Sequence, residues 1–192
     1  MPDIAKIKYA LQDAEDALRY LEFAIRLEGY CNRDPRSDSF PNFLCEFNLP
    51  HSCNLPEGIV TYNIPFSEKD IMKHTGMAIS IALGVSAQII NRAYEQAGVK
   101  IVIPPTDPPG AVRFYINQIR NLLQHTVGDP MWDIIPKKQI IIELNINNNK
   151  FNIDFASLQG KEFEYSQIGG LRFWLDAADF AIRHIKSIIK VN

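Results

Sequence analysis

The residues best suited to do chemistry lie close together, between positions 110 and 125. Arg120, Asn121 and His125 form the hexapeptide pattern R-N-x-x-x-H. An arginine always carries charge and can hold a phosphate through two parallel hydrogen bonds. A histidine at a helix C-terminus, where the helix dipole favours the imidazolium, can give or take a proton near neutral pH. The pattern therefore predicts acid–base chemistry on a phosphate ester, with Asn121 orienting His125 from one helical turn away.

The helix that carries this pattern has an unusual polar face. No acidic residue occurs between Asp107 and Asp129, so the arc opposite its apolar side is locally positive and rich in hydrogen-bond donors. Such an arc suits a phosphate or another anion, and it equally suits a partner helix that it meets through a polar network. Composition leaves both interpretations open. The arc contains Arg113, Asn117, Arg120, Asn121, Gln124 and His125.

R-N-x-x-x-H at a helix end, within an all-helical chain of this length, resembles the HEPN superfamily of helical-bundle proteins, many of which cleave RNA. The resemblance rests on the hexapeptide and the bundle, and the remaining chain is not aligned to a particular member. It implies a metal-independent endoribonuclease of toxin or defence type, in which RNA supplies the 2′-hydroxyl nucleophile. His125 would be the general acid–base and Arg120 the phosphate clamp, while Asn121 would orient the imidazole. No metal and no other cofactor is expected.

Four further residues are expected to contact the RNA. Arg113, Asn117 and Gln124 would line the groove beside the motif. Trp132 follows the motif closely, and an indole beside an RNA site can stack on a base. A core or interface plug is the other interpretation of this tryptophan.

The spacing of Arg120 and His125 places a condition on the mechanism. On a straight helix, side chains five residues apart point about 140° away from each other. The helix must therefore end or distort at His125, or a second subunit must contribute to the site. The resemblance implies the second, because sites of the superfamily form where two motifs face each other at a dimer interface. A homodimer through this helix is predicted, with RNA as substrate, and the toxin class allows an antitoxin or regulatory protein as a further partner.

A non-catalytic function is the alternative. The polar arc would then recognise a protein, a nucleotide or a nucleic acid without cleaving it. The formal net charge of −2 favours this alternative slightly, because general RNA affinity depends on neutralising phosphates. The acid-free arc and the intact motif favour the enzyme.

Amphipathic helices are predicted to position these residues. Apolar residues at alternating steps of three and four indicate long helices over 3–29 and 67–98, followed by a helix over about 110–125 and a last one from Gly169-Gly170. An asparagine run at 147–149 between alternating apolar residues indicates a β-hairpin at about 138–156. The fold is expected to be mainly α, an up-and-down four-helix or five-helix bundle with a β-hairpin between the last two helices. One domain covering 1–192 is predicted.

Two other segments need an interpretation. Prolines throughout residues 31–66 exclude a regular helix, although 58–64 favours a strand, and this segment is interpreted as an excursion over the surface or a mobile lid. Gly76, Ser80 and Gly84 form a stripe of small residues one turn apart. Close packing inside the bundle is favoured over a dimer contact for this stripe.

Composition excludes several classes of protein. With 20 basic and 22 acidic residues, the chain is not a generally basic nucleic-acid coat. Three irregularly spaced cysteines argue against a disulfide framework and favour the cytoplasm. The uncharged stretch 74–91 contains several polar residues and favours a buried helix over a membrane span. Cys45, His51 and Cys53 lack a fourth ligand for a metal site, and His74 and His184 are expected to be surface or capping groups.

Overall fold

The computed structural model describes residues 3–31, 52–55, 58–61, 68–124 and 130–191. They belong to two compact units, the first formed by residues 1–21 and 80–192 and the second by residues 22–79. The chain is mainly helical, as predicted, and the polar face described above belongs to the first unit.

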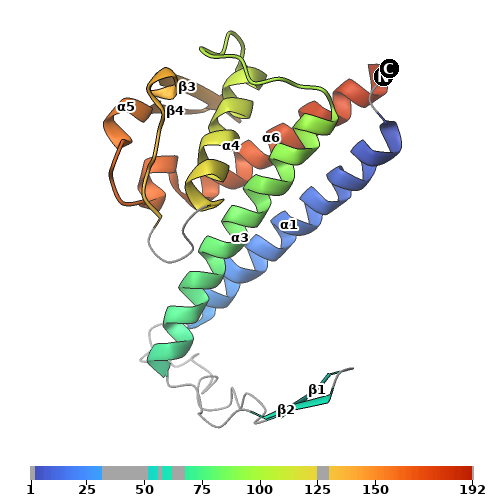
Figure 1. Cartoon of the computed structure of the whole chain (residues 1–192), viewed down its shortest axis with the longest axis vertical. Helices are drawn as coiled ribbons and strands as arrows, with labels where there is room; N and C mark the ends of the chain where they lie inside the picture. The colour runs from blue at the N-terminus through green and yellow to red at the C-terminus, as the bar shows by residue number, and fades with distance from the viewer. Residues whose placement is uncertain (1–2, 32–51, 56–57, 62–67, 125–129, 192) are drawn as a thin grey trace. The chain divides into compact units, whose positions relative to one another are not determined.

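Four long helices account for most of the described residues (Figure 1). They are α1 (Ile4–Cys31), α3 (Glu68–Gln96), α4 (Pro108–Gln124) and α6 (Gly170–Val191). Helix α4 begins two residues before its predicted start at about Gly110, because a helix tolerates prolines in its first turn. Asp107 then caps it, as its Oδ1 accepts a hydrogen bond of 2.6 Å from the Gly110 amide.

Within the first unit, successive long helices run in opposite directions, as in an up-and-down bundle (Figure 1). Their apolar stripes form the core, which includes Leu11 and Ala14 of α1, Ala87 and Ile90 of α3, Ile116 and Ile119 of α4, and Trp174 and Ile185 of α6. The alternating three–four spacing predicted the core residues named here on α1, α4 and α6, but not Ala87 and Ile90 of α3. The helical bundle with an inserted hairpin is thus confirmed.

The hairpin between α4 and α6 consists of β3 (Ile141–Ile146) and β4 (Asn149–Asp154), which pair antiparallel. Asn147 and Asn148 form its two-residue turn with φ of 52° and 64°. Asparagine tolerates this left-handed backbone better than most residues, and paired positive φ values suit the twist of a hairpin. A 3-10 turn at Pro136–Lys138 precedes the hairpin. The short helix α5 (Phe155–Leu158), which was not predicted, follows it, because Asp154 caps the two amides after Phe155.

The second unit contains the C-terminal part of α1, the N-terminal part of α3 and two short antiparallel strands. These are β1 (Ser52–Leu55) and β2 (Gly58–Thr61). The strand predicted over 58–64 is present in part, and its partner β1 was not foreseen. The rest of the proline-rich segment 31–66 lies outside the described residues, and so does the interpretation of it as a lid.

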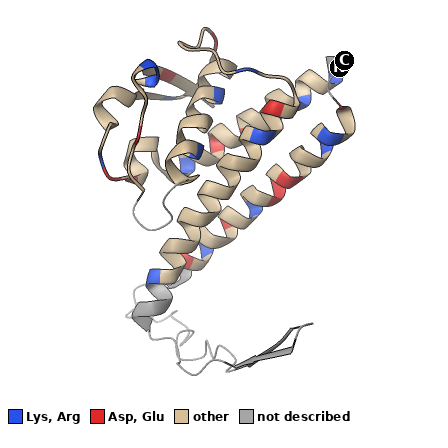
Figure 2. Cartoon of the chain, in the orientation of Figure 1, with Lys and Arg blue, Asp and Glu red and all other residues tan. Residues whose placement is uncertain are grey.

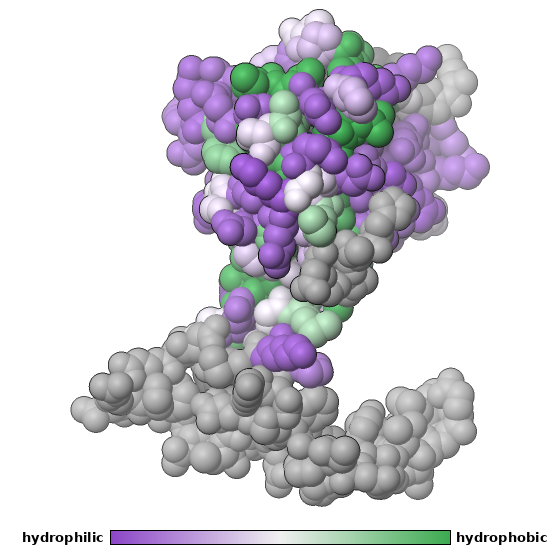
Figure 3. Space-filling view, turned by 60° about the vertical axis from the view of Figure 1, so that its left-hand side comes forward, coloured by the Kyte–Doolittle hydropathy of each residue, from purple (hydrophilic) through white to green (hydrophobic). Residues whose placement is uncertain are grey.

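The surface of the described part is mixed in character. Hydrophilic residues are interspersed with apolar ones on the face of the molecule that is turned forward in Figure 3. No helix in the described ranges is long and apolar enough to cross a membrane.

Candidate functional site on the polar face of α4

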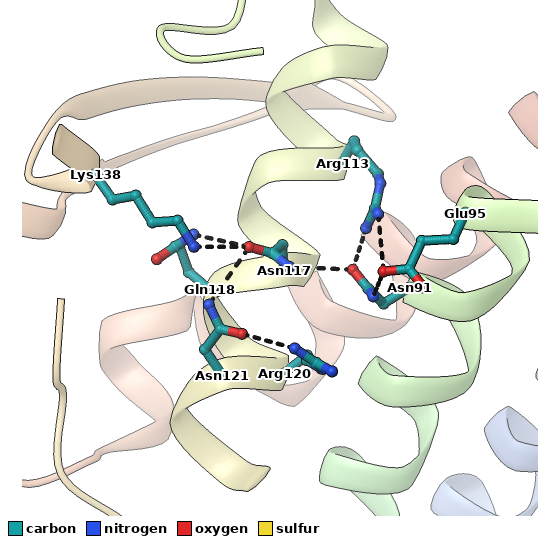
Figure 4. A network of polar contacts seen from close by, with 8 residues as sticks. All are labelled: Asn91, Glu95, Arg113, Asn117, Gln118, Arg120, Asn121 and Lys138. Atoms are coloured by element: carbon teal, nitrogen blue, oxygen red, sulfur yellow. Dashed lines mark hydrogen bonds and ion pairs between the residues drawn. The ribbon is translucent and has the colours of Figure 1, made fainter. Parts of the chain in front are cut away.

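The N-terminal half of α4 places a buried arginine against α3. Arg113 is 2% exposed, and its Nη1 donates a hydrogen bond to Asn91 Oδ1 (Figure 4). Its Nη2 lies 3.8 Å from Glu95 Oε1, and its guanidinium carbon lies 5.0 Å from the centre of the Tyr94 ring. Burial lowers the pKa of Arg113, while the charge of Glu95 acts in the opposite direction. Arg113 therefore serves the contact between two helices.

One turn later, Asn117 connects this contact to the rest of the polar face. Its Nδ2 donates to Asn91 Oδ1 at 3.2 Å. Its Oδ1 accepts three hydrogen bonds, from Lys138 Nζ at 3.1 Å, Gln118 Nε2 at 3.3 Å and Asn121 Nδ2 at 3.4 Å (Figure 4). A carbonyl oxygen has two lone pairs, so three donors exceed its usual capacity. Acceptors are scarce in this network.

Arg120 and Asn121 lie at the far end of the same network. Arg120 Nη1 donates to Asn121 Oδ1 at 3.1 Å, which leaves most of the guanidinium donors for other partners. Its Nε is buried without an acceptor. Among the residues that the structure describes, no carboxylate lies within ion-pair distance of Arg120. The Nε of Arg113 is buried without an acceptor as well. A ligand cannot reach a buried nitrogen, so an acceptor from outside would have to bind the other guanidinium nitrogens of Arg120.

Charge in the network is one-sided. Arg113, Arg120 and Lys138 bring three cations, whereas Glu95 is the one carboxylate in the described network, and its side chain is 61% exposed. Burial lowers the pKa of Lys138, and the nearby charges of Lys137 and Arg120 lower it further. Figure 2 shows α4 without any acidic residue, in agreement with its sequence. This cluster is therefore suited to an anion that carries several acceptor oxygens.

A groove of about 160 Å³ adjoins Arg120. It lies between α3 and α4, which approach closely here, since a Cβ on Gly84 would lie 3.2 Å from Leu123 Cβ. Packing inside the bundle is thus confirmed for Gly84. The groove is lined by Ser80, Ile81, Gly84, Val85 and Gln88 of α3 and by Arg120, Leu123 and Gln124 of α4.

The structure places the predicted site residues in different surroundings. Arg120 and Gln124 line the groove, and Asn121 holds Arg120 beside it. Arg113 and Asn117 were expected to line the groove, but both are buried against α3. These two residues instead contact α3 through a polar network. This is the second of the two interpretations of the polar arc given in the sequence analysis. His125 lies outside the described residues.

Trp132 is a core residue. It is 2% exposed, and its Nε1 donates to Gln167 Oε1 at 2.7 Å. The rings of Phe155 and Phe163 pack edge-on against it, with centroids 5.8 and 6.3 Å away. The expectation that Trp132 stacks on a base is therefore wrong, because its indole has no open face. The alternative interpretation, a core plug, is correct.

Four residues of the network were missed in the sequence, and one of them is Gln118, which follows Asn117 on α4. Asn91 and Glu95 are one turn apart on α3, and Asn91 interrupts an apolar stretch, which is a signal for a buried polar group. Lys138 comes from the 3-10 turn before the hairpin, and nothing in its neighbourhood along the chain marks it. Within the described ranges, no group of three histidine, cysteine, aspartate or glutamate side chains is placed to hold a metal ion.

No family model, curated protein or solved structure matches this chain. Function is therefore inferred from the residues and their surroundings.

Proposed function

We propose that this protein is a metal-independent endoribonuclease of toxin or defence type that acts as a homodimer. Arg120 carries the proposal: this cation lines an open groove and has no carboxylate partner among the described residues. An RNA phosphate would supply the acceptor oxygens and the negative charge that this position lacks. The resemblance of Arg120, Asn121 and His125 to the HEPN motif gives the reaction class.

The proposed reaction needs only proton transfer and charge stabilisation. The 2′-oxygen attacks phosphorus and loses its proton, and the bond from phosphorus to the 5′-oxygen breaks. The leaving 5′-oxygen takes up a proton. The products are therefore a cyclic phosphate and a 5′-hydroxyl. His125 would transfer these protons, and Arg120 would stabilise the charge that develops on the phosphoryl oxygens. Asn121 would hold Arg120 in place through the hydrogen bond described above.

The homodimer in this proposal comes from the resemblance to the HEPN superfamily, whose sites form where two motifs face each other. Arg120 and His125 are five residues apart and diverge on a regular helix. Two copies facing each other through this part of α4 would bring the arginine of one copy near the histidine of the other. RNA is the proposed substrate, the cytoplasm is the proposed location, and an antitoxin or regulatory protein would be a further partner of such a toxin.

Cleavage of RNA in the presence of EDTA tests the proposal. Purified wild-type protein is incubated with a mixed RNA pool, alongside His125→Ala protein and a matched His74→Ala control. We expect His125→Ala to lose at least about 100-fold in cleavage rate while it keeps its RNA affinity, because general acid–base catalysis contributes about that much. The His74→Ala protein should cleave at the wild-type rate. Equal background cleavage by wild type and His125→Ala would contradict the enzyme proposal.

A non-catalytic binding module is the second candidate. The burial of Arg113 and Asn117 favours it, because these residues contact α3 and leave fewer groups for RNA. Such a module would bind a protein, a nucleotide or a nucleic acid through Arg120 and Gln124. In the same experiment it would bind RNA without cleaving it, and His125→Ala would leave the products unchanged.

A further inference from the structure

The groove beside Arg120 has apolar walls that are open to solvent. Ile81 and Val85 lie one turn apart on α3 and are 42% and 38% exposed. Leu123 and Gly84 contact each other across the groove. Covering exposed aliphatic side chains with a flat apolar group is favourable, because it removes apolar surface from water. The groove is thus suited to a planar, mainly apolar group that is joined to an anion.

The size of the groove limits the occupant. Its volume is about 160 Å³. A protein cavity of about 150 Å³ with aliphatic and aromatic walls accommodates benzene, which is a single six-membered ring. A pyrimidine base has one ring of this size, whereas the two fused rings of a purine exceed it. The groove therefore has room for a one-ring base, whereas part of a purine would extend beyond it.

Two amides lie at the groove. Gln88 comes from α3 and Gln124 from α4, and both are exposed. Neither has a hydrogen-bond partner among the residues that the structure describes. A glutamine amide presents both a donor and an acceptor, which is the complement that the polar edge of a base requires. Single-stranded RNA is read in this way, by apolar contact with the ring and hydrogen bonds to its edge.

We propose that this groove is a pyrimidine-binding subsite, which holds the base of a nucleotide whose phosphate lies against Arg120. The proposal rests on the function proposed above and adds a preference to it. Ile81, Val85 and Leu123 contact the ring, while Gln88 and Gln124 hydrogen-bond to its edge. The preferred RNA targets are therefore single-stranded and pyrimidine-containing.

Binding of small nucleotides to the full-length protein tests this subsite. Uridine and cytidine monophosphate, adenosine and guanosine monophosphate, and ribose 5-phosphate are each titrated by calorimetry. We expect the pyrimidine nucleotides to bind about tenfold more tightly than ribose 5-phosphate, because ring burial adds to the phosphate contact. The purine nucleotides should gain less than the pyrimidine ones.

Substitutions in the groove locate the effect. Val85→Trp should fill the groove and remove the advantage of pyrimidine nucleotides over ribose 5-phosphate, while it leaves ribose 5-phosphate binding intact. Val102→Trp is the matched control, since Val102 is an exposed valine of the first unit outside the groove, and it should retain the advantage. The double substitution Gln88→Ala and Gln124→Ala changes only exposed side chains. It provides the same test if Val85→Trp does not fold.

The outcomes separate the subsite from the enzyme. Equal affinity for uridine monophosphate and ribose 5-phosphate, or a full advantage retained in both groove variants, would overturn the subsite and leave RNA cleavage to be judged by its own assay. Pyrimidine binding that depends on the groove, in a protein that does not cleave RNA, would support the subsite and refute the enzyme. A groove that binds none of these compounds, whether the protein is a monomer or a dimer, would also overturn the subsite.

Discussion

The two ends of α4 carry the same kinds of side chain in opposite surroundings. At the N-terminal end, Arg113 is buried and meets an amide, a carboxylate and an aromatic ring of α3. Two turns later, Arg120 lines an open groove and donates to one neighbouring amide. Both arginines lie on one face of one helix. The comparison shows that an acid-free polar arc can be divided between a half that is buried in a helix contact and a half that lines an open groove.

The cause of this difference lies on α3. Opposite Arg113, α3 presents Asn91 and Glu95, whose oxygens accept from the guanidinium. Opposite the end of α4, it presents Gly84 and Ser80, which line the groove and offer no carboxylate or amide to Arg120. A buried charge is tolerated only where partners satisfy it. The residues that α3 presents thus decide which arginine of α4 is paired inside the protein.

Removing the partner of the buried arginine should give the largest effect. Asn91→Ala deprives both Arg113 and Asn117 of their shared acceptor and leaves a buried guanidinium without its closest partner. We expect a loss of about 3 kcal/mol in the free energy of unfolding, measured by urea denaturation. Asn121→Ala, at the open end, removes the same side chain and should cost less than about 1 kcal/mol. Similar losses in both variants would show that the two ends do not differ in this way.

Removing Arg120 should have the opposite outcome to Asn91→Ala: ligand affinity should fall while stability is nearly unchanged. Arg120→Ala should lower the affinity for ribose 5-phosphate about 10-fold to 100-fold, because hydrogen bonds to a charged group contribute about 1.5–3 kcal/mol. Its free energy of unfolding should change by less than about 1 kcal/mol. Arg92→Ala is the charge-matched control, since Arg92 is an exposed arginine of α3 that does not line the groove. An equal loss of affinity in both variants would mean that only net charge matters.

The smallest effect concerns the pH dependence of stability near the buried end of α4, where His184 of α6 packs against Tyr94. Partial burial lowers the pKa of His184 below its ordinary value of 6.5, although Asp107 raises it. Its ring packs against Tyr94, with centroids 5.9 Å apart, and its Nδ1 is buried without a partner. Because the unfolded chain binds this proton more readily, stability should be retained above about pH 6.5 and should fall as the pH drops below that value.

His184→Phe keeps a ring against Tyr94 and removes the titration. It should reduce the decrease in Tm between pH 7.5 and pH 5.5, as followed by circular dichroism. The corresponding difference in the free energy of unfolding is expected to be a few tenths of a kcal/mol, because solvent screens a half-buried ring. The same acid-induced decrease in both proteins would exclude His184 as its source.

Local patterns were sufficient for most of the secondary structure. Alternating three–four spacing predicts a helix because it places apolar side chains on one face, whichever partner covers them. The hairpin turn is equally local, since Asn147 and Asn148 tolerate positive φ. The start of α4 differed because Pro108 and Pro109 fit into a first turn that Asp107 caps. Strand β1 was missed because its four residues, Ser-Cys-Asn-Leu, are too few for their alternation to be distinctive within a proline-rich segment.

By itself, the sequence determined the helices, the hairpin and the acid-free arc on which Arg113, Asn117 and Arg120 share one face. Only the tertiary structure decided which of them meets a partner. A helical wheel gives the direction of each side chain but not what lies opposite, and Asn91, Gly84 and Lys138 reach α4 from other parts of the chain. Burial and hydrogen-bond partners depend on those neighbours, so the division of α4 into a structural half and an open half arises only when the helices pack.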